Sequence, residues 1–155
     1  SAQLEKESFM PASSGRPSRL AIALVVSALM PGAVNAYSNA ADYVADQQAA
    51  QGCRGGIGTF SQLWETDLTG DGRPDLVIDH ANLRCGSGES SELCGASTCE
   101  AAIYVRKGQL LKRAFSIYGS IDKLGGGRIR VMEYQPAAAG PGRARILKWN
   151  GSRFK

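Results

Sequence analysis

The stretch Ala101-Ala-Ile-Tyr-Val-Arg-Lys-Gly-Gln-Leu-Leu-Lys-Arg-Ala-Phe-Ser-Ile-Tyr118 contains two β-prone runs separated by a short turn. The runs, residues 101–106 and 110–118, contain the β-branched and aromatic side chains that are enriched in strands. Between them, Lys107-Gly108 is a hairpin signal. The stretch therefore predicts a β-hairpin, and the sequence on either side extends it into a larger sheet.

Further β-prone runs, each bounded by turn residues, span residues 57–65, 75–80, 128–134 and 144–149. Gly125-Gly-Gly127 marks a turn, and Asn150-Gly151 predicts a hairpin that brings Arg153-Phe154 back against residues 146–149. Consecutive runs separated by short turns are typical of an antiparallel meander. The sequence therefore predicts a small antiparallel sheet or sandwich.

One helix is expected before the sheet. Residues 40–51 are rich in alanine, Ser38 and Asn39 are good N-caps, and Gly52 ends the helical pattern. The apolar stripe of this helix is thin, so we expect it to pack against a sheet edge. The predicted fold class is α+β, mainly β, with one N-terminal helix.

The first 36 residues predict a targeting segment. Arg16 and Arg19 precede the apolar run 20–30, and small residues occupy positions 34 and 36, which is the pattern of a secretory signal peptide cleaved after Ala36. The alternative is an uncleaved anchor, with the chain attached to a membrane through residues 20–36. In either case residues 37–155 form a single β-rich exported domain, located in the periplasm or secreted.

Four cysteines follow this segment, an even number that favours disulfides in an oxidising compartment. The short gap between Cys94 and Cys99 favours a local bridge, which leaves Cys53 to pair with Cys85. A zinc site is the competing interpretation, but no C-x2-C pair is present and His80 is the single histidine.

The most specific motif is Asp67-Leu-Thr-Gly-Asp-Gly-Arg-Pro-Asp75, hereafter the aspartate loop. Its glycines and proline exclude a helix. Oxygen ligands at this spacing suit Ca²⁺, and we expect them from Asp67, Thr69, Asp71, the carbonyl of Arg73, and Asp75. The closing Glu of an EF-hand is absent, so the expected dissociation constant is weak, on the order of 10⁻⁴–10⁻³ M. The alternative is a turn in which the carboxylates cap backbone N–H groups without metal.

The aspartate loop and the strand after it, residues 67–79, resemble the calcium loop of FG-GAP/VCBS-type repeats, here in a single copy. The chain after residue 36 also resembles small exported proteobacterial proteins of uncharacterised function. The shared features are an early Cys, the aspartate loop, the cysteine-rich middle and the final Trp149-Asn-Gly-Ser-Arg-Phe154. This second resemblance implies a location and an architecture, and no activity.

Charge is divided unevenly along the chain. Residues 37–100 contain 3 Lys and Arg against 10 Asp and Glu, whereas residues 101–155 contain 12 against 2. Much of the positive charge fits solvated strand faces, but the excess predicts an interaction patch made by Arg128, Arg130, Arg145 and Lys148. In an exported chain, an acidic protein partner or an anionic membrane surface is a better candidate than nucleic acid.

These features together predict a non-enzymatic exported domain that acts through protein–protein contacts, as an accessory subunit of a membrane or periplasmic complex. The second hypothesis is a small exported hydrolase or enzyme inhibitor that uses the Asp79-His80 region, with Ser87, Ser90 and Ser91 in the loop that follows. No nucleophile motif such as G-x-S-x-G supports it, so we expect no catalytic residue.

Overall fold

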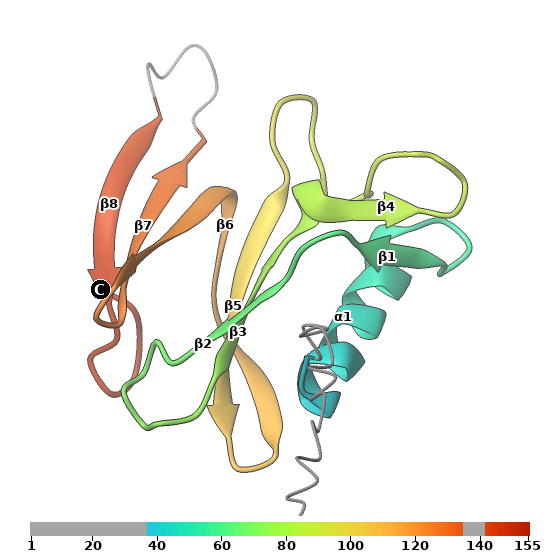
Figure 1. The fold of residues 1–155 in the computed structure, drawn as a ribbon. Helices are drawn as coiled ribbons and strands as arrows, with labels where there is room; N and C mark the ends of the chain where they lie inside the picture. Colours follow the sequence, from blue (N-terminus) through green and yellow to red (C-terminus); the bar gives the residue numbers. More distant parts are fainter. Residues whose placement is uncertain (1–36, 135–141) are drawn as a thin grey trace, which may run out of the picture. The chain divides into compact units, whose positions relative to one another are not determined.

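The computed structural model describes residues 37–134 and 142–155. The predicted signal peptide or anchor, residues 1–36, lies outside these ranges. The elements are α1 (Asn39–Gly52), β1 (Gly58–Phe60), β2 (Trp64–Thr66), β3 (Asp75–Asp79), the 3-10 turn η1 (His80–Asn82), β4 (Leu83–Cys85), β5 (Glu100–Lys107), β6 (Leu110–Gly125), β7 (Arg128–Glu133) and β8 (Arg143–Lys148). Figure 1 shows their arrangement. The mainly β prediction with one helix is confirmed.

The strands form two antiparallel sheets. Six of them are hydrogen-bonded in the order β2-β3-β5-β6-β7-β8, and β1 pairs with β4 in a separate two-stranded sheet. The hairpin predicted from residues 101–118 is the β5–β6 pair at the centre of the larger sheet, with Lys107 opposite Leu110. From β5 onward each strand pairs with the next along the chain, which is the meander that the turn signals predict.

β6 is the long strand that connects the two halves of the large sheet. Its first part pairs with β5 as far as Tyr118, and from Gly119 onward it pairs with β7. At the changeover Gly119 has a φ of 154°, and a Cβ built there would lie 1.9 Å from the Met132 carbonyl oxygen. Only glycine allows the two backbones to approach this closely, so this residue makes the change of partner possible.

The large sheet encloses the main core on one of its faces. Val77 of β3 and Leu147 of β8 belong to one buried cluster, although β8 is four strands away from β3 in the sheet order. In a flat sheet they would be about 19 Å apart. The sheet must therefore curl, and the side chains of Ile103, Ile121 and Ile129 fill the space inside the curl.

The opposite face of β3 and β5 is covered by α1. Ser38 caps the helix and accepts the Ala41 N–H, as the sequence predicts. Ala41 and Val44 then pack against Leu76 and Ala102 in a second buried cluster. The expectation that the helix packs against a sheet edge is therefore wrong. Ala41 is small enough to let the helix approach the middle of the sheet, and Leu76 supplies the apolar contact.

The predicted run 57–65 is divided between two sheets, which corrects the sequence analysis. Its first part is β1, which pairs with β4, whereas its end belongs to β2, which pairs with β3. β4 itself was not predicted from the sequence. This short strand is placed by the Cys53–Cys85 disulfide next to the end of α1, where Ala49 and Leu83 complete a third small core.

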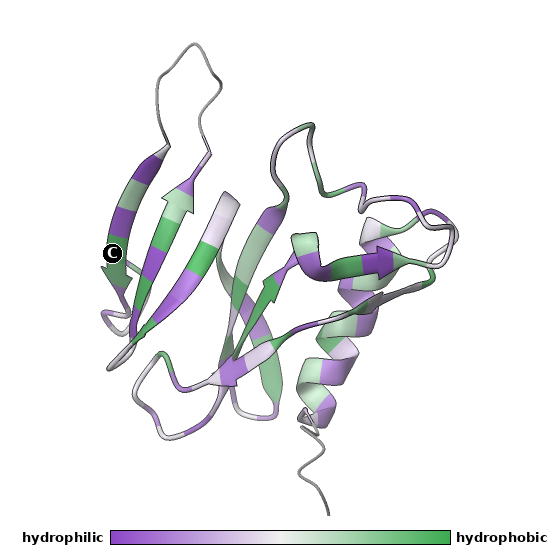
Figure 2. Cartoon of the chain, turned by 45° about the horizontal axis from the view of Figure 1, so that its top comes forward, coloured by the Kyte–Doolittle hydropathy of each residue, from purple (hydrophilic) through white to green (hydrophobic). Residues whose placement is uncertain are grey.

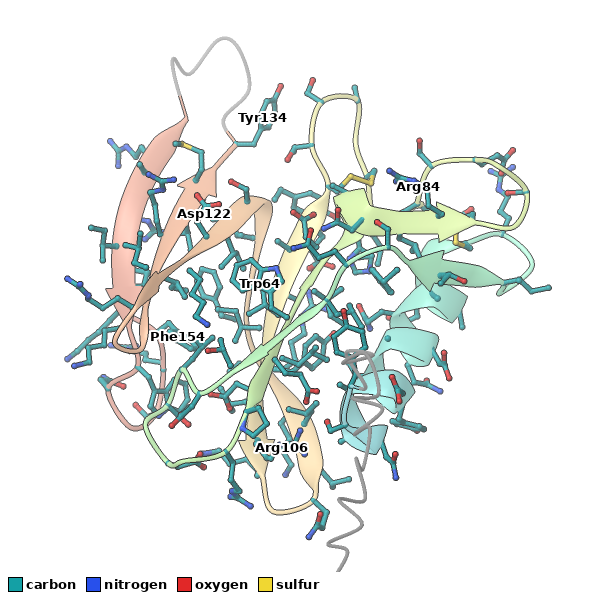
Figure 3. The ribbon with its side chains drawn as sticks, in the orientation of Figure 1. Trp64, Arg84, Arg106, Asp122, Tyr134 and Phe154 are labelled. Carbon is teal, nitrogen blue, oxygen red and sulfur yellow. A yellow bond between two sulfur atoms is a disulfide. The ribbon has the colours of Figure 1, made fainter. Side chains whose placement is uncertain are left out.

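The segment after β8 turns back as the Asn150-Gly151 signal predicts. Trp149 and Phe154 form a bridge, and their rings lie 5.1 Å apart. The Phe154 ring reaches the main core, where it also meets Phe115 edge to face at 6.3 Å; Figure 3 labels it beside β8. Two backbone hydrogen bonds join Lys148 to Lys155, each N–H donating to the other residue's carbonyl.

Candidate functional site

The aspartate loop connects β2 to β3 and is held by its own carboxylates. Asp67 accepts the N–H of Gly70 at 2.6 Å and that of Gly72 at 2.9 Å, one on each oxygen. Both glycines have positive φ values, 79° and 80°, which only glycine adopts without strain. The N–H of Gly72 is the main cause of a pKa for Asp67 below its ordinary value, because the donated bond favours the charged form.

Asp75, the last residue of the loop, is completely buried. One of its oxygens accepts the N–H groups of Leu68 and Thr69 at 2.9 and 3.0 Å, and the other accepts the N–H of Arg106 at 2.8 Å. Burying a carboxylate is costly unless its oxygens are hydrogen-bonded. Asp75 therefore connects the aspartate loop to β5. Its structural role is to accept hydrogen bonds from backbone N–H groups of both segments.

Within the structure the carboxylates of the aspartate loop accept hydrogen bonds from the protein itself. Asp75 is buried with both oxygens occupied, and Asp71 accepts the N–H of Arg73 at 3.0 Å and lies 3.4 Å from its guanidinium. In the described ranges, no group of three or more His, Cys, Asp or Glu side chains is arranged to hold a metal ion. The hydrogen bonds that backbone N–H groups donate to these carboxylates are those expected for the Asx-rich turn, and they do not test metal binding. Asp67 and Asp71 also accept hydrogen bonds on both oxygens, but unlike Asp75 they are reached by solvent, and weak Ca²⁺ binding stays a prediction.

A buried ion pair next to the loop escaped the sequence analysis. Arg106 on β5 donates to the Pro74 carbonyl at 2.8 Å, to the Ser38 hydroxyl at 2.9 Å and to a Glu65 oxygen at 3.2 Å. The Arg106 and Glu65 side chains are only 9% and 14% exposed. Glu65 in turn accepts from the N–H and hydroxyl of Ser38. This network, with Arg106 labelled in Figure 3, joins the helix cap, β2, β5 and the aspartate loop.

The structure joins Cys53 to Cys85 and Cys94 to Cys99, the pairing that the cysteine spacing favours. The first bridge connects the end of α1 to β4, and the second closes a loop just before β5. No free cysteine is left. Two disulfides indicate an oxidising environment outside the cytoplasm.

Asp79 and His80, the basis of the hydrolase hypothesis, do not form a hydrogen bond with each other. Asp79 caps η1 by accepting the Ala81 N–H, and His80 Nδ1 lies 3.2 Å from the Glu100 carbonyl oxygen. His80 is 1% exposed and packs edge to face on Phe60, and burial lowers its pKa. The Nε2 atom is buried without a hydrogen-bond partner among the described residues.

A cleft of about 880 Å³ lies beside His80 and the Cys94–Cys99 loop. Ser90 and Ser91 line it, but neither hydroxyl forms a hydrogen bond with His80 in the described part of the chain. Ser91 is buried and accepts the Leu93 N–H at 3.1 Å. The cleft therefore brings Asp79, His80, Ser90 and Ser91 into one region, without Ser87 and without a base paired to a nucleophile there.

Five of the twelve basic residues of the second half lie on β7 and β8. Arg128 lies opposite Lys148 and Arg130 opposite Ile146, so these side chains share one face of the sheet. Ile129, Val131 and Leu147 point to the other face and are buried in the main core. This alternation appears as bands of contrasting colour along both strands in Figure 2. We call the exposed side chains of Arg128, Arg130, Met132, Ile146 and Lys148 the basic outer face.

Arg145 was predicted as part of this patch, and the structure corrects that prediction. It lies opposite Val131 in the β7–β8 register, so its side chain is on the face that carries the core residues. There it pairs with Glu133 at 3.3 Å. The run Arg145-Ile-Leu-Lys148 does not alternate strictly between polar and apolar residues, and the buried Leu147 sets the face of Arg145.

The basic outer face combines charge with apolar surface. Arg130 is paired with Asp122 of β6 at 2.9 Å, whereas Arg128 and Lys148 have no acidic partner in the described ranges. Ile146 and Met132 are 62% and 41% exposed. Single exposed apolar residues are common, but here two lie among cations on a sheet face that α1 does not cover.

No helix in residues 37–134 or 142–155 has the length and apolar character needed to cross a membrane. Comparison with known proteins returned no matching family model, no matching curated protein and no matching solved structure.

Proposed function

We propose that this protein is an exported binding module, without a reaction of its own, whose basic outer face docks an acidic surface of a protein partner. In this function it serves as an accessory subunit of a periplasmic or membrane-associated complex, or as a secreted binding domain. The observation that carries the proposal is the position of Arg128, Arg130 and Lys148 on one uncovered face beside exposed Ile146 and Met132.

The composition of this face fits a protein surface well. Interfaces combine an apolar centre with a polar rim, and Arg and Met are enriched in them. The cations of this face steer an acidic partner toward it at long range. The aspartate loop and the two disulfides then support the scaffold, rather than the contact itself.

The test is capture of a partner from solubilised native membranes and periplasmic extract with the purified, oxidised protein as bait. We expect the wild type to retain a protein that the variant Arg128→Ser/Lys148→Ser loses. The control is Arg84→Ser/Lys112→Ser, which removes the same charge from exposed positions on β4 and β6. Because the attraction is electrostatic, the wild-type capture should weaken when the salt is raised from about 0.05 M to about 0.5 M.

Two results would contradict the proposal. One is equal capture by both double variants, which would show that net charge, and not this face, selects the partner. The other is binding of the wild type to vesicles that contain anionic lipid, with no protein retained, which would assign the face to a membrane surface.

A further inference from the structure

Before Lys148, the outer edge of β8 has no hydrogen-bonded neighbour among the described residues, and the hydrogen bonds show which groups point outward. Along a strand, the N–H and C=O of one residue point to the same side and those of the next residue to the other side. Lys148 uses both groups to pair with Lys155, away from β7. Ile146 and Ala144 are two and four residues earlier, so their N–H and C=O groups also point away from β7.

The register of β7 supports this assignment. The Tyr134 N–H donates to the Tyr118 carbonyl, so even-numbered residues at this end of β7 face β6 and odd-numbered ones face β8. Val131 is therefore hydrogen-bonded to Arg145, its partner in the register, and Arg145 faces inward. β8 is the last strand of its sheet, and no described residue beyond it reaches the outward groups of Ala144 and Ile146.

The charges around this edge determine what can pair with it. Residues 142–155 contain five Lys and Arg and no Asp or Glu. The side chains of Arg143 and Arg145 lie on one face of the sheet at this edge, and the side chain of Lys148 lies on the opposite face. If β8 paired with β8 of a second copy, like charges would face each other across the new ladder, and cations on an edge strand are a known protection against such pairing. An acidic strand at the same position is instead attracted by these cationic side chains.

We infer that β8 receives an extended, acidic segment of a protein partner as an additional strand of the sheet. The inference rests on the proposed function and gives it a binding mode. Hydrogen bonds to Ala144 and Ile146 supply the pairing, carboxylates of the segment meet Arg143 and Lys148, and the exposed Ile146 side chain contacts an apolar residue of the segment. Strand addition at an open edge is a general way to bind an extended peptide.

The test uses the oxidised protein and a short peptide rich in Glu, Thr and Val. We expect the peptide to bind and to slow hydrogen exchange of the Ala144 and Ile146 amides. Ile146→Pro removes one outward N–H and leaves the β7 ladder intact, because proline is tolerated where its missing N–H would face solvent. This variant should bind at least about tenfold more weakly. Ile146→Thr, which keeps the N–H, should bind within about twofold of the wild type.

A second measurement does not depend on the folding of the proline variant. The same peptide with all of its backbone amides N-methylated keeps its charge but has no N–H to donate to the outward carbonyls of β8, so its binding to the wild type should fall about tenfold. The peptide with Gln in place of Glu should also bind more weakly, because it lacks the attraction to Arg143 and Lys148.

The outcomes separate this inference from the proposed function. If N-methylation and Ile146→Pro leave affinity unchanged while Arg128→Ser/Lys148→Ser reduces it, strand addition is wrong and the basic outer face still docks its partner. If the double serine variant binds the acidic peptide as well as the wild type does, the proposed function itself is overturned. Vesicles of phosphatidylglycerol that bind and protect no amide of β8 would overturn the inference in favour of a lipid surface.

Discussion

Asp75 has the most constrained environment of any carboxylate in the aspartate loop. It is completely buried and accepts three backbone N–H groups, two from its own loop and one from Arg106. The spacing of the aspartates indicates a tight loop, but it does not show which aspartate faces solvent and which is buried in the core. The difference arises because Asp75 also begins β3, where the backbone already enters the core.

Replacing this residue tests its structural role. Asp75→Asn keeps the side-chain size but removes one acceptor and turns an amide NH₂ toward backbone donors, so we expect a loss of about 2–3 kcal/mol in the free energy of unfolding. Asp71→Asn, at an exposed position of the same loop, should change it by less than about 0.5 kcal/mol. Urea unfolding measures both, and equal losses would show that the loop carboxylates are equivalent.

Calcium binding is tested at the surface positions of the loop. With Asp75 occupied by backbone donors, we expect EDTA to leave the melting temperature of the wild type unchanged, and Ca²⁺ to raise it only at millimolar concentration. Asp71→Ala should abolish that rise. A fall in melting temperature on adding EDTA would indicate a tight calcium site. If about 10 mM Ca²⁺ does not change the melting temperature, the remaining interpretation is an Asx-rich turn without metal.

His80 predicts a pH dependence of stability. Burial lowers its pKa; the Coulombic effects of Glu100 and Asp79 oppose this, and that of Arg113 adds to it. The unfolded state, with an ordinary pKa of about 6.5, therefore binds the proton more readily. Stability from this residue is complete above that value and is lost as the pH falls through it toward the lower folded pKa.

The matched variant is His80→Asn, whose amide can still donate to the Glu100 carbonyl but does not titrate. We expect wild-type stability to fall more between pH 7 and pH 5 than that of the variant, measured by urea unfolding at each pH. If the stability of the two proteins changes in parallel with pH, protonated His80 must have a hydrogen-bond acceptor for its second N–H in the folded state.

At the level of elements, the sequence predicts the hairpins better than the connections between sheets. Local turn signals placed β5, β7 and the start of β6 closely, because the residues that pair are near each other in the chain. The position of β4 depends on Cys53, 32 residues away, and the Arg106–Glu65 pair joins residues 41 apart. A local sequence pattern does not show which residues far apart in the chain will meet. The position of β4 and the Arg106–Glu65 pair are therefore visible only in the structure.

Gly119 in β6 is a second example of a feature that the local sequence pattern does not predict. The predicted strand 110–118 stops where glycine appears, because glycine usually weakens a strand. In the structure the strand continues to Gly125, and Gly119 is the place where the β7 backbone comes closest. The residue that seemed to end the strand is the one that lets it change partner.

The Gly119→Ala variant should therefore disrupt the β6–β7 pairing. Its Cβ would collide with the Met132 carbonyl, and we expect a loss of more than about 2 kcal/mol in the free energy of unfolding. The control Gly126→Ala, in the β6–β7 turn, has positive φ but no atom within 4 Å of the new Cβ. It should lose only the strain of a left-handed alanine, about 1 kcal/mol. Equal losses would mean that backbone conformation alone explains Gly119.

For the molecule as a whole, the two sides of the sheet are covered unequally. Residues on one face of β3 and β5 pack in the main core and those on the other face pack under α1, whereas β7 and β8 are covered on one face only. The division of charge along the sequence follows this arrangement. The basic second half supplies the face left open to solvent, and the acidic first half supplies the helix and the aspartate loop.

Unequal burial predicts unequal local stability, which hydrogen exchange of the oxidised protein measures by NMR. Amides of β3 and β5 should exchange most slowly, because opening them exposes apolar side chains of both cores. The outward amides of Ala144 and Ile146 should exchange fastest among the strands of the large sheet, since water reaches them directly. Removing the first disulfide with Cys53→Ala/Cys85→Ala should accelerate exchange in β1 and β4 and leave β5 slow. Slower exchange at Ala144 and Ile146 than at Ile103 would show that the edge of β8 is already paired, and no free edge would then remain for a partner strand.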